Sequence, residues 1–167
     1  MRVLGVDPGL NVTGYGLISA ENSSCCALEE AGIIRTSSRN DISLRLKKIY
    51  DGIKEIFLEG KPEVLVLEEL YSHYQHPRTS ILMGHVRGII CLAAAEGNVP
   101  FFSYSATQVK KAISGSGHAS KKQIMRTVQS LLRLKKMPEI SDVADALALA
   151  ITHVCISGTK AKMVNVK

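Results

Sequence analysis

The 167-residue sequence lacks the paired cysteines that stabilise small secreted domains and the long apolar segments that anchor a chain in a membrane. Its few cysteines form no C-x-x-C pair, which argues against a disulfide framework and against a structural zinc site. They are Cys25, Cys26, Cys91 and Cys155. The longest apolar run, residues 89–95, is far shorter than the roughly 20 residues that span a bilayer. The first residues, MRVLGVD, do not resemble a signal peptide, so we expect a soluble protein in the reducing cytoplasm.

Intrinsic disorder and low complexity are excluded by the composition. Hydrophobic residues make up 46% of the chain and charged residues 22%. The length fits one domain, with a core large enough to fold without a metal or a disulfide. Lysine and arginine outnumber aspartate and glutamate by 21 to 15, which gives a net charge of +6 and a pI of about 9.2. This modest basic excess favours a polyanionic partner.

Hydrophobic patterning predicts five strands. They are expected at residues 2–7, 12–20, 24–36, 63–69 and 100–104. The first three are joined by short connections, which favour an antiparallel meander. The fourth is a continuous apolar run, as in a strand that is covered on both faces.

The apolar spacing changes to the helical period after residue 41. Helices are expected at residues 42–59, 77–96, 121–134 and 141–157, and a further short one is expected to begin after Ser105. Ser105 and Ser120 each begin an S-x-x-Q capping box, which is a sequence signature of a helix N-terminus. Residues 158–167 are basic, and we expect them to form a flexible tail.

These elements follow the order βββ-α-β-α-β-α-α-α, with no internal repeat and no interdomain linker. We therefore predict an α/β fold with one mixed five-stranded sheet flanked by helices. Three antiparallel meander strands would be followed by two crossover strands. Residues 1–157 are expected to form this single domain.

Acidic residues stand at the ends of several predicted elements. Asp7 ends the first strand, Glu68 and Glu69 end the fourth, and Asp142 and Asp145 begin the last helix. Each position has an ordinary structural explanation: a turn cap, an exposed strand end, or a favourable interaction with the helix dipole. Taken singly, none of them identifies a site.

Taken together, the same acids predict a metal site. Carboxyl ends of neighbouring strands form sites in open α/β sheets, so Asp7 would meet the fourth strand if strands one and four are adjacent. Asp142 and Asp145 are three residues apart and share one helical face. Converging carboxylates repel one another unless cations lie between them, and oxygen ligands favour Mg²⁺ or Mn²⁺. Two such ions about 4 Å apart are typical of phosphodiester hydrolysis.

Several motifs occur in an order that resembles a known family. They are Gly5-Val-Asp-Pro-Gly-Leu-Asn-Val-Thr-Gly-Tyr-Gly16, Leu67-Glu-Glu-Leu-Tyr71, Gly84-His-Val-Arg-Gly88, Gln108-Val-Lys-Lys111, Gly115-Ser-Gly117, Lys121-Lys-Gln123 and Asp142-Val-Ala-Asp-Ala-Leu147. The chain is similar to the RuvC-type Holliday junction endonucleases over residues 2–155. The resemblance implies a ribonuclease H-like fold, in agreement with the predicted element order.

The resemblance implies a role for four of the acids. Asp7, Glu68, Asp142 and Asp145 match the catalytic, metal-binding positions of the family. Alternation along the strand cannot decide whether Glu68 or Glu69 is the catalytic residue. The family motif places the catalytic glutamate first of the two, which selects Glu68. The implied activity is resolution of four-way DNA junctions in recombination and repair, by symmetric paired nicks. Two Mg²⁺ ions per site, or Mn²⁺ in their place, would support hydrolysis to 5′-phosphate and 3′-hydroxyl ends.

The resemblance also implies DNA contacts. Tyr71 matches an aromatic position that stacks on an unpaired base near the crossover, while Lys110 and Lys121 match basic positions near the site. Lys122 would extend this basic surface. Residues 72–77 depart from the family pattern, so their contacts do not carry over.

The resemblance implies protein partners as well. The family is homodimeric, and the predicted helix at 77–96 could form part of the interface, because Gly84 and Gly88 allow close approach of another helix. A junction-binding protein and a branch-migration motor are further expected partners. No membrane association is expected.

Three other interpretations remain open. A phosphotransferase of the actin and sugar-kinase type shares a related core, but its N-terminal loop has a different spacing, and this chain has no second lobe. A non-catalytic junction-binding module would have lost a carboxylate, and none is missing. A ribonuclease H-like nuclease for another nucleic-acid structure would differ mainly in its loops.

Overall fold

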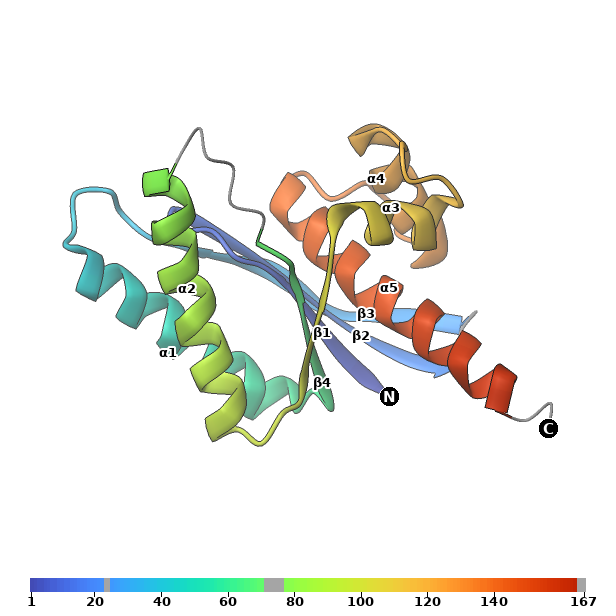
Figure 1. Ribbon diagram of the computed structural model, residues 1–167, viewed down its shortest axis with the longest axis horizontal. Helices are drawn as coiled ribbons and strands as arrows, with labels where there is room; N and C mark the ends of the chain where they lie inside the picture. Colours follow the sequence, from blue (N-terminus) through green and yellow to red (C-terminus); the bar gives the residue numbers. More distant parts are fainter. Residues whose placement is uncertain (23–24, 71–76, 165–167) are drawn as a thin grey trace.

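The computed structural model describes residues 1–22, 25–70 and 77–164, which form one mixed sheet between two layers of helices (Figure 1). The strands are β1 (Arg2–Asp7), β2 (Val12–Asn22), β3 (Cys25–Arg35), β4 (Val64–Glu68) and β5 (Phe101–Tyr104). Their order across the sheet is β3-β2-β1-β4-β5. β1, β2 and β3 pair in antiparallel fashion, while β1–β4 and β4–β5 are parallel. The predicted meander and crossover strands are confirmed.

Helices cover both faces of this sheet. They are α1 (Ile42–Gly60), α2 (Pro77–Glu96), α3 (Ala106–Ser114), α4 (Lys121–Leu131) and α5 (Ser141–Val164). Figure 1 shows α1 and α2 on one side of the sheet and α3, α4 and α5 on the other. Because β1 is buried on both faces, its successive residues enter different cores: Leu4 packs with α1 and α2, and Val3 packs with α5.

α5 lies directly against the central strands at a glycine. A Cβ atom on Gly5 of β1 would lie 1.9 Å from the carbonyl oxygen of Ala146 in α5. No larger residue fits there without moving the helix backbone. The glycine therefore sets how closely α5 approaches β1, and with it the position of the first turns of the helix.

Two helix ends differ from the prediction, while both capping boxes are confirmed by their hydrogen bonds. α4 ends at Leu131 instead of residue 134, because Arg133 has a φ of 50°, which interrupts the helix. α5 continues past Gly158 to Val164. One glycine costs a helix only about 1 kcal/mol, and the following residues tolerate helical structure. The predicted tail is thus partly helical, and its flexibility stays a prediction.

Among the described residues, two helices are long and apolar enough to cross a membrane by length and composition alone. In α5, 56% of the relevant window is buried inside the fold, as expected for a core helix. In α2 the buried share is 22%, so much of this helix faces outward.

Candidate active site

Asp7 and Glu68 lie at the same edge of the sheet. Asp7 is the last residue of β1 and pairs with Gly14 of β2. β4 runs parallel to β1 as its other neighbour and ends at Glu68. Strands one and four are therefore adjacent, which is the condition under which the sequence predicts that these two acids meet.

Glu68 and its neighbour Glu69 occupy different environments. Glu68 is half-buried, and its charge raises the pKa of Asp7. Glu69 is exposed, and its backbone N–H donates to the carbonyl oxygen of Tyr104 at 3.0 Å. Burial and charge therefore favour Glu68 as the member of the acidic cluster, a choice that strand alternation leaves open.

The start of α5 brings the two remaining acids. Asp142 lies in the first turn, beside Ser141, whose hydroxyl donates to the Asp142 carboxylate at 3.4 Å. Asp145 follows on the same face of the helix. A Cβ atom on Gly14 would lie 2.2 Å from the carbonyl oxygen of Asp142, so glycine allows this turn to rest on β2.

The charges of the other three acids act on Asp7. The pKa of Asp7 is raised from 3.8 to about 7. Burial is the largest cause, followed by the charges of Asp145, Glu68 and Asp142. The pKa of Glu68 is also raised, first by burial and then by Asp145. Carboxyl groups perturbed in this way inside a cleft are typical of functional sites.

Lysine side chains supply positive charge to the cluster. The Lys121 ammonium lies 2.8 Å from a carboxylate oxygen of Asp145. It also lowers the pKa of Asp7 and of Glu68. Lys110, on α3, lowers the pKa of Glu68 as well. Both lysines therefore lie close to the acids, and their proposed contact with DNA stays a prediction.

Two cavities meet at Glu68. The first, of about 240 Å³, has an apolar floor that includes Val109 and Ile124, and a polar rim of Glu68, Lys110, Lys121 and Asp145. The second, of about 360 Å³, is lined by Asp7, Pro8, Glu68, Ser80, Met83 and Thr107, among others. Of the four acids, Asp7, Glu68 and Asp145 therefore line this pair of cavities, and Asp142 lines neither.

The chemistry of this donor set fits a divalent cation. Carboxylate oxygens are the ligands that Mg²⁺ and Mn²⁺ prefer, and the pKa of Asp7 is raised first by burial and then by the charges of the neighbouring acids. Within the part of the chain that the structure describes, no group of three or more His, Cys, Asp or Glu side chains is arranged to hold a metal ion. The cation that neutralises Asp145 here is Lys121.

Known proteins match this chain in sequence and in fold. Residues 3–153 match the family model of the crossover junction endodeoxyribonuclease RuvC. A RuvC of Rhodopirellula baltica is 48% identical over 149 residues, which cover 89% of this chain and 83% of that protein. One of Caldicellulosiruptor saccharolyticus is 41% identical and covers 95% of both chains. This chain belongs to the RuvC family. The structure of T. thermophilus RuvC in complex with Holliday junction substrate matches it with a TM-score of 0.91 at 31% identity, over 96% of each chain.

The match to RuvC confirms the predicted family and the ribonuclease H-like fold. Of the predicted DNA contacts, Tyr71 and the divergent segment 72–76 lie outside the described residues. Lys122 is exposed on α4, next to Lys121. Unlike Lys121, it is not among the residues that line the two cavities at Glu68, so its role in RuvC function stays a prediction.

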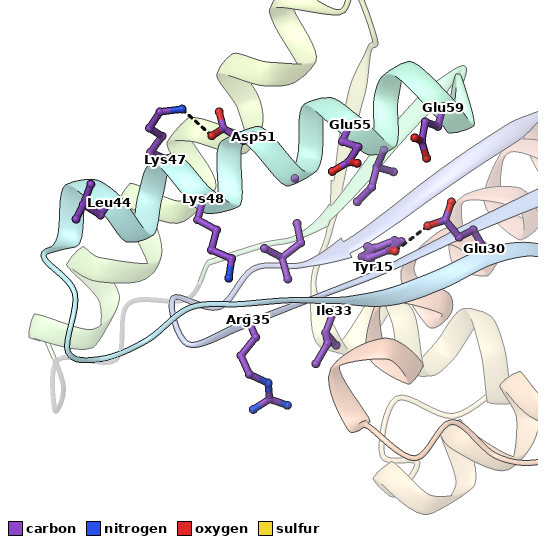
Figure 2. Close-up of a pocket in the computed structure, with 13 residues that line it drawn as sticks. Tyr15, Glu30, Ile33, Arg35, Leu44, Lys47, Lys48, Asp51, Glu55 and Glu59 are labelled. Atoms are coloured by element: carbon purple, nitrogen blue, oxygen red, sulfur yellow. Dashed lines mark hydrogen bonds and ion pairs between the residues drawn. The ribbon is translucent and has the colours of Figure 1, made fainter.

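A separate groove of about 700 Å³ runs between α1 and β3 (Figure 2). Tyr15 lies at one end, where its hydroxyl donates to Glu30 at 2.7 Å. Glu55 and Glu59 lie near it in Figure 2, and together these charges and burial raise the pKa of Tyr15 to about 12. Lys48 lies at the other end. The acidic end is unsuited to a phosphate backbone, so we do not assign this groove to DNA.

Arg87 is the functional candidate that the sequence-based prediction misses. It lies within Gly84-His-Val-Arg-Gly88. From the sequence alone, this segment is only one of the family motifs and part of a possible dimer interface. Its guanidinium donates to the backbone carbonyl oxygen of Glu68 and to the hydroxyl of Ser103. No sequence pattern predicts that an arginine on a helix contacts the end of a strand far away in the chain.

Proposed function

We propose that this RuvC-family protein resolves four-way DNA junctions in recombination and repair. It cuts phosphodiester bonds at the cleft formed by Asp7, Glu68, Asp142 and Asp145. The observation that carries the proposal is the meeting of the acids at one sheet edge: Asp7 and Glu68 end the adjacent parallel strands β1 and β4, and the charges of the other three acids all raise the pKa of Asp7. The family match and the likeness to T. thermophilus RuvC bound to Holliday junction substrate support the substrate class.

The four acids are the proposed ligands of two divalent ions, Mg²⁺ or Mn²⁺. When bound, such ions activate the attacking water and stabilise the leaving oxygen. Asp7 and Glu68 supply ligands from the sheet edge, and Asp142 and Asp145 supply them from α5. The proposed products carry 5′-phosphate and 3′-hydroxyl ends.

The lysines of the rim are proposed to bind the scissile strand. Lys110 and Lys121 stand beside the acids, where an ammonium attracts a phosphate and offsets charge that develops during cleavage. Lys121 would have to leave Asp145 as the metal ions bind. Tyr71 and Lys122 are proposed to extend the contact along the junction.

A homodimer is proposed because two opposed strands of a junction must be cut symmetrically. α2 carries an outward stripe suited to this role. Ile81 and Leu92 are 61% and 53% exposed, and a Cβ atom on Gly84 or Gly88 would meet nothing within 4 Å. A second copy of α2 could therefore pack closely on this stripe. A junction-binding protein and a branch-migration motor are the proposed further partners, and the cytoplasm is the proposed location.

The decisive experiment is cleavage of a labelled synthetic junction with a mobile core, beside a linear duplex of the same sequence. We expect paired nicks in the junction alone, with Mg²⁺ or Mn²⁺ and not with chelator. DNA ligase should reseal them if the ends are 5′-phosphate and 3′-hydroxyl. Binding without cutting under all conditions would instead indicate a non-catalytic junction-binding module.

A matched pair of variants tests the site itself. Glu68→Gln removes a charge from the cluster, whereas Glu69→Gln removes one from the exposed neighbouring position. We expect the first to lose cleavage by at least about 100-fold and the second to stay within a few-fold of the unmodified protein. Equal losses in both would refute the assignment of Glu68.

A further inference from the structure

We propose that Arg87 is a positioning residue for Glu68. It holds the end of β4 from α2 and so fixes where the Glu68 carboxylate lies. The inference rests on the proposed function, since it assigns a helper to one of its catalytic acids. The contacts of the arginine carry it.

The guanidinium of Arg87 connects the ends of two strands. One terminal nitrogen donates to the backbone carbonyl oxygen of Glu68, the last residue of β4. The other donates to the hydroxyl of Ser103 in β5 at 2.5 Å. The arginine is half-buried, and both terminal nitrogens are used inside the protein. Both contacts tie the side chain to the fold.

On the β1 side, the backbone pairing of β4 ends before Glu68, whereas on the β5 side the Glu69 N–H still donates to Tyr104. The last β1–β4 pair is Val6–Leu67, so the backbone of Glu68 lies beyond that ladder. In the parallel pairing of β4 with β5, Glu68 and Tyr104 are the last two residues that lie opposite each other. The carbonyl oxygen of Glu68 finds its donor in Arg87, through a partly buried hydrogen bond from α2.

Arginine suits this position better than lysine. Its planar guanidinium presents several donors in a fixed geometry, so one side chain can hold β4 and β5 together. The helix that carries it is itself fixed, because the neighbouring Val86 and Ile90 are fully buried in the core beneath α2. The position of Glu68 is therefore set by the packing of α2 as well as by the sheet.

The test compares four variants with the unmodified full-length chain. Arg87→Gln removes both contacts, Ser103→Ala removes one, and Arg87→Lys keeps the charge without the planar fork. Arg2→Gln is the matched control, because Arg2 also donates to a backbone carbonyl, that of Gly60 at 3.2 Å, but at the start of β1. Each is measured for single-turnover cleavage, for junction affinity in chelator, and for hydrogen exchange of residues 64–69.

We expect Arg87→Gln to lower the single-turnover rate by about 10–100-fold, with junction affinity unchanged within about 2-fold. Ser103→Ala should lose less, and Arg87→Lys should recover part of the rate. Exchange at the end of β4 should become faster in Arg87→Gln and stay unchanged in Arg2→Gln. Ser103→Ala keeps the test decisive if Arg87→Gln does not fold.

Two outcomes overturn the proposal. In the first, the Arg87 and Ser103 variants cleave at the normal rate with normal exchange. In the second, junction affinity falls as much as the rate, which would assign Arg87 to DNA binding or to the fold in general. Failure of the unmodified protein to cut junctions would refute the proposed function instead. The exchange measurement would then still decide whether Arg87 holds β4.

Discussion

Lys121 and Asp145 form an ion pair of 2.8 Å at the edge of the acidic cluster. The lysine is on α4 and the aspartate on α5, so the pair exists only because these helices pack on the same face of the sheet. The same ammonium lowers the pKa of Asp7 and of Glu68. One lysine thus offsets part of the repulsion among the proposed metal ligands.

Stability of the metal-free protein should depend on the ionisation of Asp7. Its pKa is about 7 in the fold against 3.8 for an ordinary aspartate, so the folded state holds a proton that the unfolded chain releases in between. The free energy of unfolding should therefore fall as the pH rises from about 4 to 7, by up to about 4 kcal/mol. Asp7→Asn should reduce this loss and leave only the smaller part that comes from the raised pKa of Glu68. Denaturant unfolding in chelator at pH 4.5 and pH 8 measures it, and parallel pH profiles for both proteins would contradict it.

Removing the charge of Lys121 should increase the repulsion. In Lys121→Met, the pKa of Asp7 should move above its present value of about 7, and the loss of stability with pH should extend further upward. Lys122→Met, one residue along the same exposed helix start, is the control and should leave the titration unchanged. Carboxyl carbon NMR titrations of both variants provide the measurement. Identical midpoints for Asp7 in the two would show that Lys121 does not act on the cluster.

A methyl group at Gly5 should displace α5. Its Cβ atom would lie 1.9 Å from the carbonyl oxygen of Ala146, so the helix must move away from β1. We expect Gly5→Ala to lower the free energy of unfolding by about 1–3 kcal/mol, a typical cost of overpacking. Cleavage should fall as well, because Asp142 and Asp145 move with the helix. Thermal unfolding and junction cleavage test this, and unchanged stability would refute the close packing.

Alanine at Gly84 and Gly88 should have opposite effects on the monomer and the dimer. Nothing lies within 4 Å of a Cβ atom at either position, so each substitution should stabilise α2 by about 1 kcal/mol through helix propensity. The same methyl groups would keep a second α2 at a distance and weaken self-association. Sedimentation equilibrium combined with denaturant unfolding separates the two effects. A dimer of unchanged affinity would exclude this stripe as its interface.

The sequence predicts most of the fold because its local signals agree with the tertiary structure. The apolar run before Glu68 is a strand buried on both faces, and the capping boxes at Ser105 and Ser120 begin helices as expected. The ends of α4 and α5 were less predictable. The positive φ of Arg133 could not be predicted from its residue type, because arginine rarely adopts this conformation. Gly158 is compatible with either the end or the continuation of a helix.

For the site, the sequence by itself determined which acids are available and, through the family motifs, which of them to combine. Only the tertiary structure decided that Glu68 is half-buried while Glu69 is exposed, because local alternation fails in a strand covered on both faces. Only the packing of helices on the sheet brought Lys121 to Asp145 and Arg87 to the end of β4. Such contacts join residues far apart in the chain, and their energies depend on geometry and burial that local sequence patterns do not encode.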